Sequence, residues 1–105
     1  MSLKKSEIWE WKNWKISWSL SQKSTCDKNI NILLVHGFGA SKNHWRHNQD
    51  ILGKFSNCYA IDLLGFGESS QPRALLNYEP YEENSIKYSF DLWSNQISTF
   101  CSEVI

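Results

Sequence analysis

Residues 14–21 alternate between apolar and polar side chains with a period of two. The apolar positions are Trp14, Ile16, Trp18 and Leu20, and the polar positions are Lys15, Ser17, Ser19 and Ser21. This alternation is typical of a strand with one buried face. The apolar segment 8–11 precedes it, and only Lys12 and Asn13 separate the two. The pattern therefore predicts a β-hairpin over about residues 7–21.

Residues 30–35 are apolar almost throughout, and residues 57–62 form a second predicted buried strand that ends at Asp62. Continuous apolar runs of this length are typical of strands buried on both faces in a parallel sheet. Between them, residues 42–54 predict a helix with Ser41 as its N-cap and Gly53 weakening its last turn. Its expected buried face consists of Trp45, Ile51, Leu52 and Phe55. Because both connections are short, residues 30–62 are predicted to form a right-handed, parallel βαβ unit.

The last part of the chain predicts a loop followed by a helix. Residues 63–87 contain both prolines and many charged side chains, which favours a long surface loop. Ser89 is a suitable N-cap for a helix over about 89–105. The apolar positions of this helix form one stripe, namely Trp93, Ile97, Phe100, Cys101 and Val104. Together the elements predict one partial α/β domain over residues 1–105, with a further parallel strand expected after Ile105.

Composition restricts the function further. Eleven basic side chains balance eleven acidic ones, which argues against nucleic acid or an anionic membrane as a partner. The longest purely apolar run is Ile32–Val35, far shorter than the roughly 18–20 residues of a membrane span. The first residues lack the apolar core of a signal peptide, and three widely spaced cysteines favour reduced thiols over disulfides. A cytoplasmic protein without a membrane span is therefore expected.

Two glycine-containing motifs follow the two predicted parallel strands. The first is HGFGAS at residues 36–41, with Trp45-Arg46 in the following helix, and the second is DLLGFGESSQP at residues 62–72. In this combination and at this spacing, the motifs resemble those of the α/β-hydrolase fold family. The resemblance covers roughly residues 9–105 and implies the N-terminal part of such a sheet. Within the family, the motifs are most similar to pheophytinase- and chlorophyll dephytylase-like esterases of cyanobacteria and plants.

The resemblance implies hydrolysis of an ester-like bond in a small-molecule substrate, through an acyl-enzyme and without a cofactor. The family's nucleophile lies in a G-x-S-x-G turn, followed along the chain by an acid and a histidine. No serine of this chain lies in such a turn, and all three histidines precede its expected position beyond residue 105. The chain alone is therefore expected to be inactive. What it carries is an expected oxyanion-hole donor, the backbone N–H of Phe38.

Seven further residues are expected to shape the two loops: His36, Gly37, Gly39, Asp62, Gly65, Gly67 and Ser69. His36 is expected to bond to backbone groups and not to act as a base. Gly39 occupies a position at which haloalkane dehalogenase- and epoxide hydrolase-like relatives favour proline, so it favours an ester or related acyl substrate. Asp62 is expected to accept hydrogen bonds from loop N–H groups, with a catalytic acid as the alternative.

Other functional interpretations are weaker. His44 and His47 have the spacing of two helical metal ligands, but no further ligands accompany them, so no metal site is expected. Gly65-x-Gly67 lacks the third glycine and the immediate helix of a dinucleotide site. The tryptophans of the hairpin favour packing over ligand stacking. The rival function is a small non-enzymatic module that binds an apolar partner through its Trp-rich hairpin and the Tyr78–Tyr88 loop.

Overall fold

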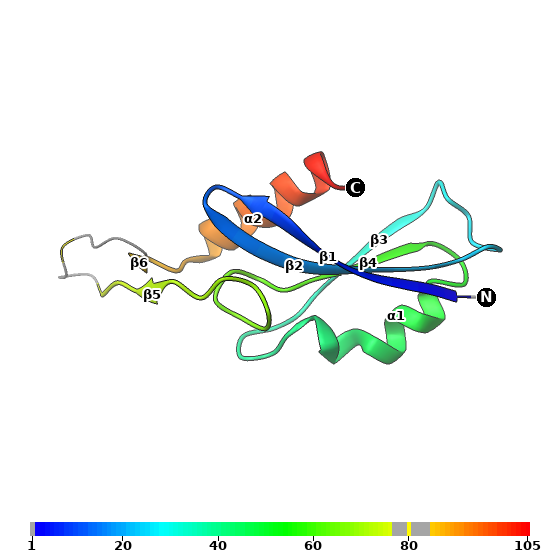
Figure 1. Ribbon diagram of the computed structural model, residues 1–105, viewed down its shortest axis with the longest axis horizontal. Helices are drawn as coiled ribbons and strands as arrows, with labels where there is room; N and C mark the ends of the chain where they lie inside the picture. Colours follow the sequence, from blue (N-terminus) through cyan, green and yellow to red (C-terminus); the bar gives the residue numbers. More distant parts are fainter. Residues whose placement is uncertain (1, 77–79, 81–84) are drawn as a thin grey trace.

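A four-stranded mixed sheet with a helix against each face forms the core of the protein (Figure 1). The computed structural model describes residues 2–76, 80 and 85–105. The strand order is β1-β2-β4-β3, in which β4 lies between strands from two different parts of the sequence. This arrangement confirms the predicted α/β class.

The predicted hairpin is present and is longer than expected. β1 (Ser2–Trp11) pairs antiparallel with β2 (Trp14–Lys23), and Trp11 lies opposite Trp14. The two-residue turn contains Lys12 at a φ of 58°. A positive φ at this position matches the twist of a tight hairpin, which is why two residues suffice to reverse the chain.

The predicted parallel pairing is confirmed. β3 (Asn31–Val35) and β4 (Asn57–Ile61) run parallel, joined by a 3₁₀ turn, η1 (Lys42–Trp45), and a helix, α1 (Arg46–Leu52). β4 also pairs antiparallel with β2, which leaves β3 at the edge of the sheet. The side chains of Ile32 to Val35 are therefore only partly buried, whereas their continuous apolar character predicted burial on both faces.

The serine-bearing face of β2 is buried, which differs from the half-exposed strand that its alternation predicted. Ser17, Ser19 and Ser21 are all buried. α1 lies over this face, and the amide nitrogen of Gln49 donates hydrogen bonds to the Ser19 and Cys58 carbonyls. The small serine side chains let the helix approach closely, and the glutamine satisfies polar groups that would otherwise be buried without a partner.

The helix α2 (Phe90–Glu103) covers the opposite, tryptophan-rich face of the sheet. The Ser89 hydroxyl caps it by accepting a hydrogen bond from the Leu92 N–H. Phe100 is fully buried, with its ring in contact with three aromatic side chains of the sheet, Trp9, Trp18 and Tyr59. This aromatic cluster is the centre of the hydrophobic core.

The predicted buried faces of both helices are wrong in part. Ile51 and Phe55 were expected to be buried but are 57% and 65% exposed, and the buried position of α1 is Gln49. Cys101 was expected in the buried stripe of α2 but is exposed, whereas Gln96 is fully buried. In both helices a glutamine occupies the centre of the interface because it bonds to polar groups of the sheet or its loops.

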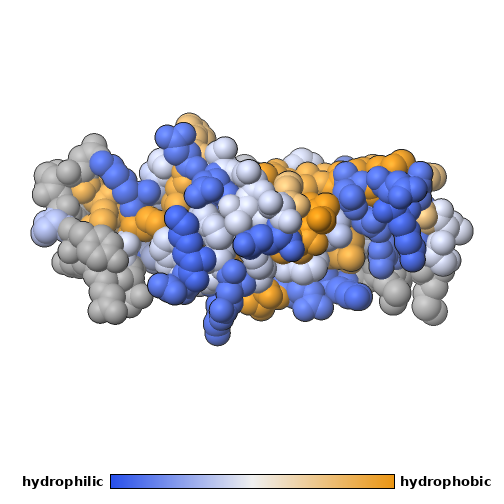
Figure 2. Space-filling view, turned by 90° about the horizontal axis from the view of Figure 1, so that it is seen from above, coloured by the Kyte–Doolittle hydropathy of each residue, from blue (hydrophilic) through white to orange (hydrophobic). Residues whose placement is uncertain are grey.

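The predicted surface loop contains one further pairing at its base. β5 (Arg73–Ala74) and β6 (Ser85–Ile86) are parallel and form a two-stranded sheet of their own. Tyr78, which the binding-module hypothesis invoked, lies outside the described residues. Figure 2 shows a band of apolar surface along its upper right margin, at the end of the molecule where Figure 1 places β3. In the described part of the chain, no helix has the length and apolar character needed to cross a membrane.

Candidate functional site

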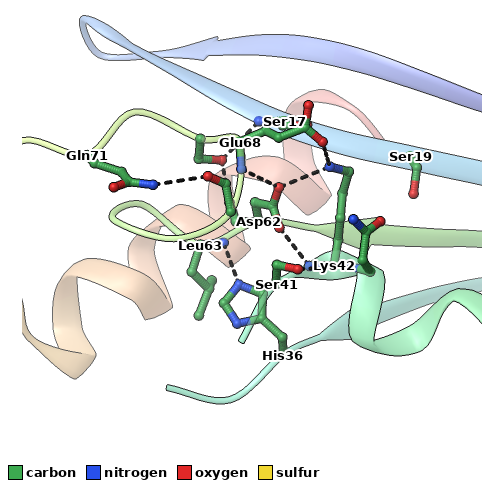
Figure 3. Close-up of polar contacts among 12 residues, drawn as sticks. Ser17, Ser19, His36, Ser41, Lys42, Asp62, Leu63, Glu68 and Gln71 are labelled. Carbon is green, nitrogen blue, oxygen red and sulfur yellow. Dashed lines mark hydrogen bonds and ion pairs between the residues drawn. The ribbon is translucent and has the colours of Figure 1, made fainter. Parts of the chain in front are cut away.

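The two motif loops lie together because they follow neighbouring parallel strands. Residues 36–41 follow β3 and residues 62–72 follow β4, so both leave the sheet at the same edge. Figure 3 shows their polar side chains converging, with Asp62 between Lys42 and Glu68. In open α/β sheets, ligands commonly bind at the carboxyl ends of the strands, which makes this edge the candidate site.

His36 joins the two loops through both of its ring nitrogens. The ring is buried, Nδ1 lies 2.7 Å from the Gly37 carbonyl oxygen, and Nε2 accepts a hydrogen bond from the Leu63 N–H at 3.0 Å. Because Nε2 accepts, the proton of a neutral imidazole resides on Nδ1 and is donated to Gly37. Both nitrogens are occupied by backbone groups, so His36 has no free nitrogen for proton transfer in this state.

A buried ion pair forms the second connection between the loops. Asp62 is fully buried and accepts from the Lys42 N–H at 2.6 Å, the Lys42 Nζ at 3.0 Å and the Glu68 N–H at 3.0 Å. Lys42 Nζ also contacts the exposed Glu68 carboxylate at 2.9 Å. Burial lowers the pKa of Lys42, but hydrogen bonds to Glu68 and Asp62 outweigh it, so the pKa is raised above its usual value.

Lys42 and Glu68 are absent from the residues that the sequence singled out. Lysine and glutamate are usually solvated, so their presence in motif loops did not indicate burial. The sequence shows only that Lys42 directly follows the Ser41 cap. What distinguishes Lys42 is its proximity in space to Asp62, the aspartate at the end of β4. That proximity follows from the parallel pairing of β3 and β4 and is not visible in the order of residues along the chain.

Two glycines of the second loop are required by close contacts. Gly67 has a φ of 56°, and a Cβ there would lie 2.4 Å from the Asp62 carboxyl group. Gly65 has a φ of 94°, and a Cβ there would lie 2.7 Å from the Tyr88 ring. Both positions therefore combine a left-handed backbone with no room for a side chain. In the first loop, Gly39 also has a positive φ of 77°, but a Cβ at Gly37 meets nothing within 4 Å.

Ser69 connects the second loop to the sheet. Its hydroxyl donates to the Asp62 carbonyl at 2.7 Å and accepts from the Ser17 N–H at 2.9 Å. The neighbouring Ser70 hydroxyl accepts from the Lys15 N–H in the same way. These contacts continue the hydrogen bonding of β2 beyond β4, which fixes the loop against the sheet.

Phe38 extends from the first loop into solvent and is 90% exposed. Its ring contacts the Phe66 ring of the second loop edge to face, with ring centroids 5.3 Å apart. Among the described residues, no group accepts a hydrogen bond from the Phe38 N–H. A free backbone donor at the carboxyl edge of the sheet can bind an incoming oxygen atom.

Two cavities adjoin the motif loops and share Phe38, Phe66, Tyr88 and Trp93 as lining residues. The larger cavity, of about 810 Å³, is lined by Val35–Phe38, Leu63 and Phe66 and by residues of the α2 region between Tyr88 and Ile97. The smaller cavity has a volume of about 420 Å³. Its lining residues are Phe38, Gly65, Phe66, Gln71, Pro72, Ala74, Tyr88 and Trp93. Both volumes are within the range of small-molecule sites.

The cavity walls present apolar surface. Trp93 Nε1 donates to the Leu64 carbonyl at 3.0 Å, and the Tyr88 hydroxyl donates to the Pro72 carbonyl, so the polar atoms of both rings are occupied. Burial raises the pKa of the Tyr88 hydroxyl above its usual value. Among the residues that the structure describes, no lysine, arginine, aspartate or glutamate lines either cavity. This part of the walls suits an apolar group.

The described residues contain neither a serine–histidine pair nor a metal cluster. No serine hydroxyl among them is hydrogen-bonded to a histidine ring, and no group of three potential ligands is close enough to hold a metal ion. His44, one of the two histidines considered as ligands, contacts the Trp45 ring instead.

Comparison with known proteins identifies the family. The alpha/beta hydrolase fold family matches residues 30–101. A pig protein named "1-acylglycerol-3-phosphate O-acyltransferase ABHD5" is 36% identical over 76 residues, which are 72% of this chain and 22% of that protein. A mouse "(Lyso)-N-acylphosphatidylethanolamine lipase" is 33% identical over 82 residues, which are 78% of this chain and 22% of that protein.

Solved structures agree on the fold. A bacterial membrane phospholipase A has a TM-score of 0.76 at 23% identity, covering 96% of this chain and 28% of that one. A thioesterase domain from the curacin biosynthetic pathway has a TM-score of 0.74 at 19% identity, covering 98% of this chain and 34% of that one. The chain thus spans about a fifth of the length of the curated relatives it matches. The family match over residues 30–101 agrees with the strand order and with the two motif loops. The chain therefore belongs to the alpha/beta hydrolase fold family.

Proposed function

We propose that this chain supplies the oxyanion-binding part of an enzyme that hydrolyses an ester-like bond. The observation that carries this proposal is the Phe38 N–H, from which no described residue accepts a hydrogen bond and whose residue lines both cavities at the carboxyl edge of the sheet. The residues on either side of Phe38 along the chain, His36 and Lys42, are fixed by hydrogen bonds to Leu63 and Asp62, which supports a loop of fixed shape. Such preorganised donors stabilise the negative charge that develops on a carbonyl oxygen during acyl transfer.

The remaining catalytic groups are proposed to come from polypeptide outside residues 1–105. A serine Oγ would attack the ester carbonyl carbon and pass its proton to a histidine, while the carbonyl electrons move to the oxygen bound by Phe38. Collapse of this intermediate releases the alcohol with that proton and leaves an acyl-enzyme, which water then hydrolyses to the acid. The open edge of β3, next to the larger cavity, is the place where a nucleophile-bearing strand would join the sheet.

The proposed substrate is a small molecule that carries an ester-linked acyl group. The names of the relatives refer to acyl groups on phosphate-bearing lipids: a 1-acylglycerol-3-phosphate O-acyltransferase and a (lyso)-N-acylphosphatidylethanolamine lipase. The apolar side chains that the described residues contribute to the cavities support an acyl group as the part bound there. A closer relationship to pheophytinase-like esterases and a cytoplasmic location both stay predictions from the sequence.

Ester hydrolysis tests the proposal. The 105-residue chain and the product of its longer reading frame are each mixed with a p-nitrophenyl ester, and the initial burst of p-nitrophenol is measured. We expect a burst from the longer product only, and its loss when the serine of a G-x-S-x-G segment is changed to alanine. A longer frame without such a segment, or a burst unaffected by that change, would contradict the proposal.

A binding module is the second candidate, favoured by the apolar cavities and by the absence of a serine–histidine pair among the described residues. It predicts that the 105-residue chain is a monomer that unfolds cooperatively, with a stop codon directly after Ile105. Light scattering and thermal unfolding distinguish this candidate from the hydrolase.

A further inference from the structure

We infer that Gln96, a residue of α2, is a positioning residue for the oxyanion donor at Phe38. It acts through the backbone at the end of β4 and through the His36 ring. The inference rests on the proposed function, because it takes the Phe38 N–H as the donor. It goes further by assigning a role in that function to a glutamine that lines neither cavity.

The His36 ring fixes the peptide unit to which the donor belongs. The Gly37 carbonyl and the Phe38 N–H are parts of one trans peptide, so they point in opposite directions. His36 Nδ1 donates to this carbonyl at 2.7 Å, and the hydrogen bond therefore sets the direction of the Phe38 N–H. It also polarises the peptide, which makes its N–H a stronger donor.

The proton on Nδ1 of His36 depends on the Leu63 N–H. This N–H donates to Nε2 at 3.0 Å, so Nε2 keeps its lone pair and the proton of the neutral ring resides on Nδ1 (Figure 3). If Leu63 moved away, the ring could carry its proton on either nitrogen. With the proton on Nε2, the ring could not donate to the Gly37 carbonyl. The direction of the donor therefore depends on the position of the backbone at Leu63.

Two side chains of α2 hold the backbone next to Leu63. The Gln96 amide oxygen accepts from the Leu64 N–H at 2.9 Å, and its nitrogen donates to the Asp62 carbonyl at 3.2 Å. The Trp93 indole N–H donates to the Leu64 carbonyl at 3.0 Å. Gln96 thus binds the residues on both sides of Leu63, and both backbone groups of Leu64 have partners on α2.

The hydrogen bond from Leu64 to Gln96 is the one that nothing nearby can replace. Gln96 and Leu64 are both fully buried, so water does not reach this N–H. The Asp62 carbonyl, in contrast, also accepts from a serine hydroxyl of the second loop. A buried N–H without a partner is costly. Without the Gln96 amide, the backbone is therefore expected to shift and to weaken the hydrogen bond between Leu63 and His36.

Nitrogen NMR of the 105-residue chain tests the inference without requiring catalysis. At about pH 8 an ordinary imidazole is neutral, and the ¹⁵N shifts of its ring show which nitrogen carries the proton. We expect the His36 proton on Nδ1 in the unmodified chain and a mixture of both tautomers in Gln96→Leu. Hydrogen exchange of the Leu63 amide should be at least about tenfold faster in this variant.

Gln49→Leu is the matched control. Gln49 is also a buried glutamine of a helix, but its hydrogen bonds go to β2 and β4 and not to residues 62–64. The variant should leave the His36 tautomer unchanged and the Leu63 exchange rate within about twofold, because the two sites share no partner. A difference between Gln96→Leu and Gln49→Leu therefore separates positioning from a general loss of stability.

Trp93→Phe is the second variant, and it decides the question if Gln96→Leu does not fold. It removes the N–H that binds the Leu64 carbonyl and keeps an aromatic ring. We expect the same tautomer change to a smaller extent. Trp9→Phe is its control, since the Trp9 indole N–H binds Glu103 at the other end of α2. This control should leave the tautomer unchanged.

An unchanged His36 tautomer in the α2 variants would overturn the inference, as would an equal change in their controls. Activity gives an independent readout in a protein that joins residues 1–105 to the proposed nucleophile-bearing polypeptide. There, Gln96→Leu should lower kcat for a p-nitrophenyl ester at least about tenfold and change KM less than about twofold. Gln49→Leu should leave both within about twofold.

The two readouts separate the inference from the proposed function. A tautomer change in Gln96→Leu, in a protein that hydrolyses no ester in its joined form, would support the coupling between α2 and Phe38 and contradict the hydrolase. Ester hydrolysis with the same kcat in Gln96→Leu as in the unmodified protein would support the hydrolase and overturn the inference.

Discussion

The Lys42 ammonium lies 3.0 Å from the Asp62 carboxylate, and both side chains are buried. This pair joins the end of the first motif loop to the end of β4, while the Leu63 N–H joins the same strand end to His36. The relative position of Phe38 and Phe66, and hence of the two cavities, depends on these connections.

Replacing Lys42 by methionine should lower the free energy of unfolding by about 3–5 kcal/mol, because it leaves the Asp62 charge buried without a counterion. Glu68→Gln is the matched control, since Glu68 contacts the same ammonium but is 75% exposed. Glu68→Gln should lower the free energy of unfolding by only about 0–1 kcal/mol. Urea unfolding measures both values. Equal losses of unfolding free energy in Lys42→Met and Glu68→Gln would show that the buried Lys42–Asp62 pair stabilises the protein no more than the exposed Lys42–Glu68 contact does.

Stability should fall in alkaline solution. The folded-state pKa of Lys42 lies above its usual value of 10.5, so the stabilisation is complete below that value and is lost as pH rises through the folded pKa. The pKa of Tyr88 is also raised above 10.0, so the unfolded chain releases that proton first and stability falls in the same direction. Urea unfolding from about pH 9 to about pH 12 should show a shallower decline for Lys42→Met and for Tyr88→Phe than for the unmodified chain. Parallel declines would contradict both assignments.

Gly67→Ala should destabilise the protein by at least about 1–3 kcal/mol, since the position has a positive φ and its Cβ would overlap the Asp62 carboxylate. Gly37→Ala provides the comparison, because a Cβ at that position meets nothing. We expect that variant to stay within about 0.5 kcal/mol of the unmodified chain. Thermal unfolding of the two variants side by side is sufficient, and a larger effect at Gly37 would be inconsistent with the loop geometry.

Gln96→Leu should cost about 1–3 kcal/mol although it makes α2 more apolar. The Gln96 amide oxygen accepts from the Leu64 N–H at 2.9 Å, and its nitrogen donates to the Asp62 carbonyl at 3.2 Å. The substitution would leave the Leu64 N–H buried without a partner, while the Asp62 carbonyl would keep the hydrogen bond from the Ser69 hydroxyl. Cys101→Ser, on the exposed side of the same helix, should change stability by less than about 0.5 kcal/mol. A stabilising Gln96→Leu would show that these hydrogen bonds contribute little.

The sheet could be predicted from the sequence because its signals are local. The period of two at Trp14–Ser21, the short turn at Lys12 and the two apolar runs determine which strands form, and short connections determine how β3 and β4 pair. The resemblance of residues 36–41 and 62–72 to family motifs located the candidate site. Both kinds of information can be read from neighbouring residues.

The buried polar groups could not be predicted in this way. Hydropathy assigns Gln49, Gln96 and Lys42 to solvent, yet all three are buried because polar partners face them across the structure. These partners are 9 to 34 positions away along the chain. The exposed Cys101 is the complementary case, since the rotation of α2 is set by Gln96 and Phe100.

The role of Phe38 is tested most directly by removing its N–H alone. In a protein that joins residues 1–105 to the proposed nucleophile-bearing polypeptide, phenyllactic acid at position 38 replaces this N–H by an ester oxygen and keeps the side chain. Phe38→Leu keeps the N–H and changes the side chain. If the N–H stabilises the oxyanion, kcat for a p-nitrophenyl ester should fall about 10²–10³-fold with phenyllactic acid and only a few-fold with leucine. An unchanged kcat with phenyllactic acid would contradict the assignment of Phe38 as the oxyanion donor.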